Sequence, residues 1–600
     1  MNVRNYFKII LILFIISIFL CGILQLGVSY SSFDTIKQRI DAFSLDGSAD
    51  VFNQIFFSKI VKKLRISSVL FIGLSIVLYF NKGRVLLYLT SLLESMRVFI
   101  KDILKTFNKV IGEEDKRHIY ALLVIIVIAV FLRSYYLLQP IRYDEAHMFN
   151  AYASKPLYIG LTNYSLPNNH LFHTFLTHIT YLSFGNKLWA IRSNDFLAGI
   201  LMVPVSYMIM RMFYDKYTGL LSAGIIASSS ALIEFSTNAR SYTIISLVFL
   251  ILLAVLKYLK NKRNTAAWGF FVIFSSLGLY TTPVMVYPFL VAVIWFFLSM
   301  LLNDMNYSRR LILKDFLLSL FVIVCLTGIF YSPVIIGSGL NSIIGNDAVS
   351  GSKIISIRNL GLVSVGVWDL FNRDVPNFIY FVLIAGFFTS LLFHKKLSDD
   401  RISIFVAVVL LITLIMLFKI IPFPGWKRHW LFLLPIYIGI ASSGVAFILK
   451  TIGTRIMLSK HFVFAFLSII ISLWLGINVV SSQSVYYSND TGTLRDAEDI
   501  TFYIKQKLKP DDRILANCPS DSPLLYYFNL HNVSSKFLFD SPATGGRIFI
   551  VVNLSAKQTL DRIIGGEKVV RNNYSTPELI KKYEFANLYL MNKIINEEEN

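Results

Sequence analysis

The stretch HIYALLVIIVIAVFLRSYYLLQPIRYDEAHMF, residues 118–149, decides how the chain folds. It starts with an apolar run of about 20 residues, long enough to cross roughly 30 Å of hydrocarbon as an α-helix. Two adjacent carboxylates, Asp144 and Glu145, follow this run. Carboxylates at the edge of a bilayer are costly, so the pair is a candidate functional site. The alternative is that both side chains are simply solvated beyond the end of a helix.

The composition extends this pattern to the whole chain. Of 600 residues, 55% are hydrophobic and 16% are charged, and the mean hydropathy is +0.62. The formal net charge is +21, but the Lys and Arg residues occur in short clusters between apolar runs. Such clusters are typical of topology signals rather than of a nucleic-acid surface. We therefore predict a polytopic α-helical membrane protein with membrane lipid, and not nucleic acid, as its partner.

The first apolar run predicts a membrane anchor, and the positions of the cysteines do not predict disulfides. Residues 7–27 follow basic residues and lack a small-residue cleavage site, which favours a signal anchor over a cleaved signal peptide. Cys21 and Cys325 lie in apolar runs, and Cys518 lies in the polar tail. No pair of these cysteines is placed to form a disulfide framework.

Thirteen apolar runs are candidate membrane spans. With a cytoplasmic amino terminus, every loop on the inner side is basic, as the positive-inside rule requires. The runs are 7–27, 66–80, 118–138, 193–212, 217–236, 240–258, 266–281, 284–302, 314–335, 376–394, 402–420, 430–449 and 461–480.

The segment HLFHTFLTHITYLSF, residues 170–184, would invert this scheme if it crossed the membrane. It carries three histidines, so we predict a helix that lies in the membrane interface. The outer side then receives residues 139–192, the loop 336–375, the turn PFPGWKRHW at 422–430, and everything after residue 480.

The chain is predicted to have three parts. Residues 1–117 hold two amino-terminal spans and a basic cytoplasmic segment, and residues 118–480 hold the membrane core with interfacial helices at 144–187. In the polar tail, 481–600, the strand-like DRILA and RIFIVV alternate with the helix-like LRDAEDITFYIKQKL and SPLLYYFNL. This alternation predicts a small extracytoplasmic α/β domain.

Basic residues also gather on the predicted outer side, against the general charge trend. Arg240 stands in NARSYT between two spans, and Lys427, Arg428 and His429 follow PFPGW. A phosphate held at the outer leaflet accounts for them, because guanidinium groups pair bidentately with phosphate oxygens. The alternative for Arg240 is snorkelling to lipid head groups.

Carboxylates beside such cations suit sugar transfer from a lipid-phosphate donor. The acceptor hydroxyl loses a proton to a positioned carboxylate, while cations stabilise the charge that develops on the departing phosphate. Successive helical residues point about 100° apart, so the two carboxylates do not address the same atom. We predict Asp144 as the base and Glu145 as an acceptor-binding or supporting group.

Four features in order resemble the GT-C glycosyltransferases that use polyprenyl-phosphate sugars. The resemblance is to family 39, the relatives of the protein mannosyltransferases, and to the lipid A aminoarabinose transferases. RYDEAHMF is similar to the family's acidic pair in its first large outer loop, and PNNHLFHTFL to its N-H-P-L segment. SFGNKLWAIRSNDFLAGILMVPVSYMIMR is similar to its fG...l..R pattern, and NARSYTIISL to its aRsY pattern. The likeness covers residues 118–302 well and the rest loosely.

The resemblance implies a GT-C-like membrane core, an inverting transfer on the outer face and an extracytoplasmic carboxy-terminal domain. By motif position, Asp144 takes the place of the catalytic acid, Arg240 a donor-phosphate role and His170 that of the motif histidine. Combined with the charge argument, the predicted site has Asp144 and Glu145 as catalytic residues. Its donor-phosphate ligands are Arg240, Lys427 and Arg428, and its acceptor or donor contacts are Asn169, His170, Tyr242 and His429.

Two departures from the family pattern are visible. NNHLFHT lacks the proline that usually follows the histidine, and two extra spans precede the core. Some relatives use a divalent metal ion, so Mg²⁺ or Mn²⁺ is left open as a cofactor, although no second acidic cluster completes a site. Asp347, Asp369 and Asp374 in the loop 336–375 are read as solvated charges, and that loop is a candidate lid over the donor.

Two rival functions remain. A flippase or transporter for lipid-linked saccharides would need paired polar groups near the midplane of several spans, whereas the notable groups here gather at the outer edge. A polysaccharide polymerase or ligase would not be expected to carry the early acidic pair. The sequence selects neither the donor sugar nor the acceptor, which is a glycan, a lipid or a protein.

Overall fold

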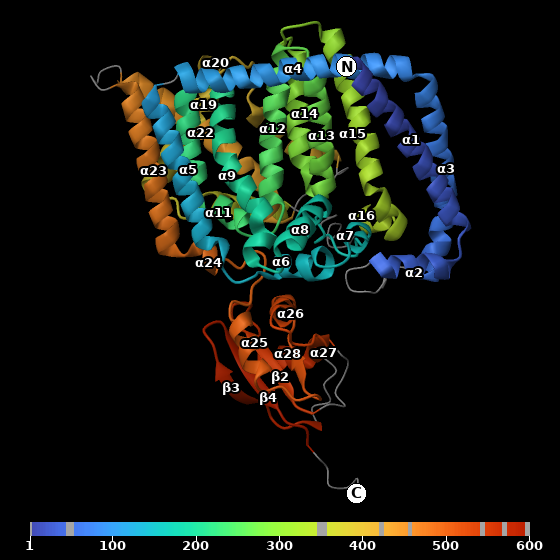
Figure 1. Ribbon diagram of the computed structural model, residues 1–600. Helices are drawn as coiled ribbons and strands as arrows, with labels where there is room; N and C mark the ends of the chain where they lie inside the picture. Colours follow the sequence, from blue (N-terminus) through green and yellow to red (C-terminus); the bar gives the residue numbers. More distant parts are fainter. Residues whose placement is uncertain are drawn as a thin grey trace.

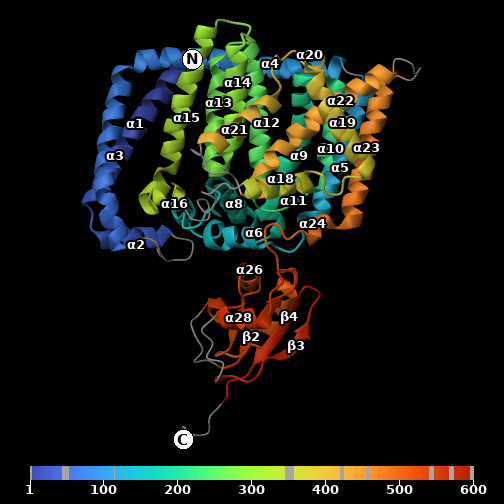
Figure 2. The same cartoon turned by 180° about the vertical axis from the view of Figure 1, so that it is seen from behind.

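The computed structural model describes residues 3–43, 53–113, 115–344, 357–418, 425–453, 459–539, 546–566 and 573–594. These residues form a broad slab of helices with a small domain, which contains a β-sheet, against one face of the slab (Figures 1 and 2). The apolar runs of the sequence build the slab, and the polar tail builds the small domain.

The amino-terminal helices form a pair at the edge of the slab. Helix α1 (Val3–Tyr30) packs along α3 (Gln54–Phe80), and the short α2 (Phe33–Phe43) lies between them in the chain. A Cβ atom at Gly22 would lie 2.8 Å from the Cγ1 atom of Ile72, so glycine permits this close approach. Among the candidate spans of the described chain, α3 is the least enclosed by protein, and α1 is as little enclosed as the span Arg309–Gly337.

The predicted basic segment after the second span is a long surface helix. Helix α4 (Lys82–Glu113) lies across one face of the slab instead of passing through it (Figure 1). It is tied to the core where the Ser95 hydroxyl donates to Asn264 Oδ1 at 2.9 Å and where Asp102 pairs with Lys262 at 2.5 Å. The amino-terminal pair is therefore joined to the core through this helix.

The membrane core contains the remaining long apolar helices. Helices α12 and α22 are the most enclosed of the described spans, whereas α5, α15 and α23 expose more apolar surface. The elements are α5 (Lys116–Leu137), α9 (Leu188–Phe213), α10 (Lys216–Ala227), α11 (Ser230–Ser236), α12 (Tyr242–Asn261), α13 (Thr265–Thr281), η2 (Pro283–Met285), α14 (Val286–Leu301), α15 (Arg309–Gly337), α16 (Asn341–Ile344), α18 (Ile357–Phe371), α19 (Asn377–Leu392), α20 (His394–Leu397), α21 (Ile404–Phe418), η3 (Lys427–Leu433), α22 (Leu434–Gly453) and α23 (Lys460–Ser482).

Fewer candidate spans are found among the described residues than the thirteen predicted. By length and composition, the described residues contain 9 helices able to cross a membrane, or 10 when the bent pair α10 and α11 counts as one span. The other three predicted spans are helical but shorter: α13 has 17 residues, α19 has 16 and α21 has 15. Each of these three helices falls on its predicted apolar run, and the run 376–394 is interrupted where α19 ends at Leu392 and α20 begins at His394.

The bent pair brings a polar segment to the edge of the slab. Helices α10 and α11 meet at an angle of 62°. The carbonyl of Ala227 at the end of α10 accepts a hydrogen bond from Nη1 of the buried Arg133 at 2.8 Å. This bond satisfies a carbonyl that the interrupted helix leaves without an intrahelical partner. After α11, residues 237–241 connect to the start of α12.

Short helices follow α5 at this edge. They are α6 (Tyr143–Met148), η1 (Phe149–Ala153), α7 (Leu157–Thr162) and α8 (Leu171–Phe184). Helix α8 has 14 residues, packs against α7 and α9, and lies beside α6 at the edge of the slab (Figure 1). The segment 170–184 is therefore a short helix and not one of the candidate spans.

The two faces of the slab differ in what they carry. The amino terminus, α4 and α20 lie at one face, and α2, α6, α16 and α24 (Ser484–Tyr487) lie at the other, next to the small domain (Figures 1 and 2). The acidic pair and the carboxy-terminal domain are therefore on the same side, as the count of spans and basic loops predicted.

The small domain is built on a four-stranded mixed sheet of order β1-β2-β4-β3. Strand β1 (Arg513–Leu515) is parallel to β2 (Ile548–Asn553), which is antiparallel to β4 (Ala586–Met591), and β3 (Glu578–Lys582) forms the edge. Strand β2 is buried along its whole length, which agrees with its run of β-branched residues. The helices are α25 (Ala497–Lys505), α26 (Asp521–Leu530), α27 (Lys536–Phe539) and α28 (Leu560–Gly566). The hairpin of β3 and β4 was not anticipated from the sequence.

Candidate active site

Helix α6, which carries the acidic pair, is fixed by Glu145. This side chain is fully buried, and Arg192 of α9 donates to it through Nε at 3.0 Å and also through Nη2. The backbone N–H groups of Arg142 and Ala239 donate to its two oxygens at 2.8 and 2.9 Å. Burial alone would raise the pKa of Glu145, but the charge of Arg192 and these hydrogen bonds outweigh it and hold the pKa below its usual range. The carboxylate of Glu145 is thus fully engaged by protein donors.

Asp144 has a different environment. Its Oδ2 atom lies 3.5 Å from Nη2 of Arg428, and 16% of its side chain is exposed. Its backbone N–H donates to the carbonyl of Thr491 at 3.1 Å, and its own carbonyl accepts from the Asn168 amide at 3.0 Å. The backbone is therefore held on both sides, while the partly exposed carboxylate has one loosely placed cation beside it.

Arg428 joins the second basic motif to the acidic pair. Its Nε atom donates to the hydroxyl of Tyr242 at 3.3 Å, and its Nη1 atom donates to the carbonyl of Asp490 at 2.8 Å. The guanidinium also lies over the ring of Trp426, 4.6 Å from the ring centre. The 3₁₀ turn at the start of η3 thus presents this cation to α6, although the two segments are nearly 300 positions apart in the sequence.

Arg240 supplies a second, buried cation. Its side chain is 3% exposed, and its guanidinium lies 5.9 Å from the ring centre of Tyr242. Nη1 donates to the carbonyl of Asn168 at 3.0 Å, but Nε is enclosed without a hydrogen-bond partner. No carboxylate in the described part of the chain forms an ion pair with it. A buried guanidinium without a counter-ion is costly, so the site as it stands favours an anion.

His170 lies beside this cation as a neutral ring. Burial, followed by the charge of Arg240, lowers its pKa well below the ordinary value. Its Nδ1 atom accepts from the backbone N–H of Ser241 at 3.4 Å and lies 2.6 Å from the hydroxyl of the same residue. Because the backbone N–H can only donate, the ring proton is assigned to Nε2.

The remaining predicted residues have different surroundings. The amide of Asn169 donates to the carbonyls of Gly160 and Asn163 at 2.8 Å each, so it holds the local loop. His429 lies 5.9 Å from Tyr242 between ring centres, and its buried Nδ1 has no hydrogen-bond partner. Lys427 is 39% exposed and reaches Asp490 at 3.5 Å.

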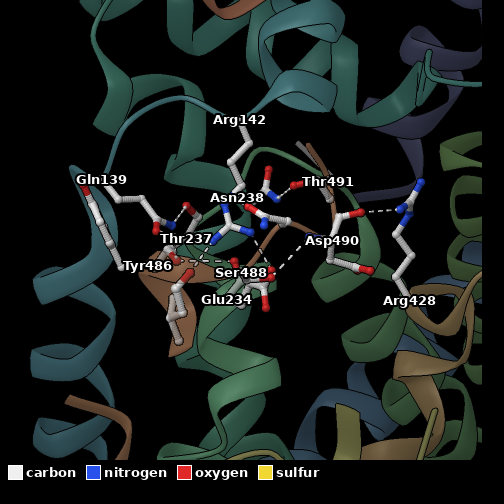
Figure 3. Close-up of polar contacts among 12 residues, drawn as sticks. Gln139, Arg142, Glu234, Thr237, Asn238, Arg428, Tyr486, Ser488, Asp490 and Thr491 are labelled. Carbon is white, nitrogen blue, oxygen red and sulfur yellow. Dashed lines mark hydrogen bonds and ion pairs between the residues drawn. The ribbon is translucent and has the colours of Figure 1, made fainter. Parts of the chain in front are cut away.

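A buried ion network next to α6 was missed from the sequence (Figure 3). Glu234 of α11 is fully buried between two guanidinium groups, 2.5 Å from Arg142 Nη1 and 2.6 Å from Arg373 Nη1. Arg142 also donates to the carbonyl of Val485 at 2.5 Å. A carboxylate inside the apolar run 217–236 was the available signal, because an acid there requires a partner.

The segment that follows the last span was missed as well (Figure 3). The carbonyl of Gly492 accepts from the backbone N–H of Tyr143 at 3.2 Å, and the Thr491 hydroxyl accepts from Asn238 at 3.1 Å. With Asp490 beside Lys427 and Arg428, residues 490–492 bring three consecutive positions into the site. The sequence of this polar segment contains no motif that marks it.

The described residues do not suit a metal ion. They contain no group of three or more His, Cys, Asp or Glu side chains that could hold one, and we assign no step to a metal. Asp369 is exposed, and Asp374 accepts a hydrogen bond from the Ser484 hydroxyl. Asp347 lies outside the described residues, as does part of the loop 336–375, so the lid remains a prediction.

Comparison with known families agrees with the motifs around this site. Residues 168–336 match the family model described as dolichyl-phosphate-mannose-protein mannosyltransferase. The resemblance to the GT-C glycosyltransferases is confirmed. The matched range includes Asn169, His170, Arg240 and Tyr242, whereas Asp144 lies before it. As predicted, the chain resembles membrane enzymes of the GT-C glycosyltransferase type, and the matched range covers 169 of its 600 residues.

Several solved structures are similar to the chain. ArnT from Cupriavidus metallidurans in the apo state is 13% identical over 78% of this chain and 97% of its own length, with a TM-score of 0.48. The same protein bound to undecaprenyl phosphate has 13% identity, the same coverage and a TM-score of 0.43. The Archaeoglobus fulgidus oligosaccharyltransferase, in complex with Zn and sulfate, is 12% identical over 78% of this chain and 72% of its own, with a TM-score of 0.44. In sequence, no curated protein matches the chain.

Proposed function

We propose that the chain transfers a sugar from a polyprenyl-phosphate donor to an acceptor hydroxyl or phosphate, with Asp144 as the base and Arg240 and Arg428 as ligands of the donor phosphate. The observation that carries this proposal is the buried Arg240, which has no counter-ion among the described residues and an unpartnered Nε. Asn168 links it to Asp144, because its carbonyl accepts from Arg240 and its amide donates to the Asp144 carbonyl. An anion site therefore stands next to a carboxylate that can take a proton.

With a hydroxyl acceptor, the reaction is a displacement at the anomeric carbon. The acceptor oxygen forms the new bond to that carbon as its proton passes to Asp144. The bond between the anomeric carbon and the phosphate oxygen breaks, and its electron pair stays on the phosphate. Attack opposite the leaving group inverts the anomeric configuration. Arg240 and Arg428 stabilise the charge that develops on the phosphate, and the Nε2 proton of neutral His170 is available as a further donor.

Glu145 acts in this proposal as a positioning residue. Its carboxylate is saturated by Arg192 and by the backbone N–H groups of Arg142 and Ala239, so it holds α6 instead of meeting the acceptor. Asn169 likewise acts as a positioning residue, because its amide holds the loop before α8 through the carbonyls of Gly160 and Asn163. Lys427 and His429, the sequence neighbours of Arg428, are in this proposal further contacts of the polyprenyl-phosphate sugar.

We also propose that the face with α6 and the carboxy-terminal domain is extracytoplasmic. Basic residues support this orientation: α4 lies on the opposite face with Lys82, Arg84, Arg97, Lys101, Lys105 and Lys109. Positive charge is characteristic of cytoplasmic loops. In this orientation the residues 1–117, 118–480 and 481–600 act as an amino-terminal attachment, a catalytic core and an outer domain.

Transfer of radiolabel tests the proposal. Membranes containing the wild type or Asp144→Asn are incubated with radiolabelled polyprenyl-phosphate sugars, and label is followed into products. Loss of the base should lower transfer by about 100-fold or more. Asp399→Asn is the matched control, because it makes the same chemical change at an exposed position between α20 and α21. If Asp144→Asn transfers as well as the control, Asp144 is not the base.

A further inference from the structure

A carboxylate from the chain that follows the last span stands in the proposed phosphate site. Asp490 Oδ1 lies 3.5 Å from Lys427 Nζ, and the Asp490 side chain is 7% exposed. Its other oxygen, Oδ2, is enclosed without a hydrogen-bond partner. A buried carboxylate that is only half satisfied is unfavourable, so stability alone does not account for it.

The backbone around Asp490 fixes the position of this carboxylate. Its carbonyl accepts from Arg428 Nη1 at 2.8 Å, and the next two carbonyls accept from the N–H groups of Asp144 and Tyr143. Gly492 has a φ of +70°, and a Cβ atom there would lie 2.8 Å from the Cβ atom of Tyr143. The backbone of this segment is thus held closely against α6, and Asp490 lies beside Arg428 (Figure 3).

The charge on Asp490 opposes any anion that uses the same cations. Burial, and then the nearby Glu234, raise the pKa of Asp490, while Lys427 and Arg428 counteract this rise. When ionised, the Asp490 carboxylate neutralises part of the positive charge of Lys427 and Arg428 that would otherwise attract a lipid phosphate. Its effect grows with the charge of the phosphate, because the repulsion scales with the product of the charges.

We propose that Asp490 competes with lipid phosphate for Lys427 and Arg428 and thereby favours release of the product over release of the donor. This inference rests on the proposed function. The donor is a phosphate diester with one negative charge. Transfer breaks its bond to the sugar and leaves a monoester, which carries about −1.5 to −2 charges near pH 7. Asp490 therefore repels the product more strongly than the donor and keeps the leaving lipid from blocking the site.

Two lipid probes of different charge test this proposal by direct binding. Undecaprenyl phosphate is the monoester, and its methyl ester is a diester that carries one charge and no sugar. The purified full chain in detergent is titrated with each probe as wild type, as Asp490→Asn and as Asp499→Asn. Asp499 is an exposed aspartate of α25, so it provides the same chemical change away from the site.

The expected pattern is a charge-dependent gain in affinity. Removing one charge at a separation of about 4 Å, with screening close to that of bulk water, should tighten diester binding about 5-fold and monoester binding about 10- to 25-fold. Asp499→Asn should match the wild type. In turnover, Asp490→Asn should show stronger product inhibition by undecaprenyl phosphate.

Other outcomes overturn the proposal. Equal affinities in Asp490→Asn and wild type, or weaker binding by the variant, would mean that Asp490 does not compete, while the phosphate site itself would stand. If the wild type binds neither probe, the proposed function fails together with this inference.

A measurement on the wild type covers the case in which Asp490→Asn does not fold. The diester keeps one charge between pH 7 and 4, so a change in its affinity reports on the protein. Protonation of Asp490 should tighten its binding about 5-fold as the pH falls. The charged groups that act on Asp490 are Lys427 and Arg428 of η3 and Glu234 of α11, and Asp144 of α6 pairs with the same Arg428. Asp144→Asn should keep this pH response, and a flat profile in that variant would contradict the proposal.

Discussion

Substitution of Glu145 by Gln separates the two members of the acidic pair. The change keeps the size of the side chain but removes the charge that pairs with Arg192, and both residues are fully buried. It also turns one of the two acceptor oxygens into an amide that can only donate, where Arg192 and two backbone N–H groups all require acceptors. Breaking a buried ion pair in this way costs about 3–5 kcal/mol.

Asp144→Asn should cost much less stability. Its carboxylate lies 3.5 Å from Arg428 and is partly exposed, so the lost interaction is worth about 1 kcal/mol or less. Thermal unfolding of both variants in one detergent therefore gives a clear ranking, with Glu145→Gln unfolding at the lower temperature. Transfer assays should show both variants inactive, for different reasons.

The pH dependence provides a second test of Glu145. The pKa of Glu145 is lowered in the folded protein. Its ionised form therefore stabilises the fold at pH values above the ordinary carboxyl pKa, and this stabilisation is lost as the pH falls through the pKa that Glu145 has in the folded protein. The wild type should thus lose stability below about pH 4.3 more steeply than Glu145→Gln. If Glu145→Gln unfolds at the same temperature as Asp144→Asn and with the same pH dependence as the wild type, the assigned positioning role is wrong.

Three further changes test the surroundings of the site. Arg240→Gln should weaken binding of undecaprenyl phosphate about 10- to 100-fold, as expected for a lost charged hydrogen bond, and unchanged affinity in a titration would argue against a phosphate ligand. Gly492→Ala should lower transfer strongly, because its Cβ atom would collide with Tyr143; a fully active variant would show that α6 tolerates displacement. Glu234→Gln leaves Arg142 and Arg373 without their shared partner, and it should lower the unfolding temperature as much as Glu145→Gln does.

Sequence patterns identified the architecture well because hydrophobicity and charge act locally. Each apolar run became a helix, and the histidine-bearing segment 170–184 stayed at the edge of the slab. Among the described residues the span count was too high because run length alone does not reveal where a helix ends, as at Leu392, where α19 stops just before α20. The strands β3 and β4 were missed because their short sequences resemble loop residues until β4 pairs with β2 and β3 pairs with β4.

The candidate site was only partly readable. Asp144, Arg240 and Arg428 could be proposed because their charges stand next to apolar runs. Glu145 could not be separated from Asp144, since only the folded position of Arg192 shows which carboxylate is enclosed. Asp490 carries no local signal at all: its importance arises from a backbone path that returns under α6 after the last span.

The most direct test is a cryo-electron microscopy map of the protein with undecaprenyl phosphate. The account predicts phosphate density in contact with both Arg240 and Arg428, beside Asp144 and on the face that carries the small domain. Phosphate density on the opposite face, next to α4, or an Arg240 that contacts no lipid phosphate in a fully occupied complex, would contradict it.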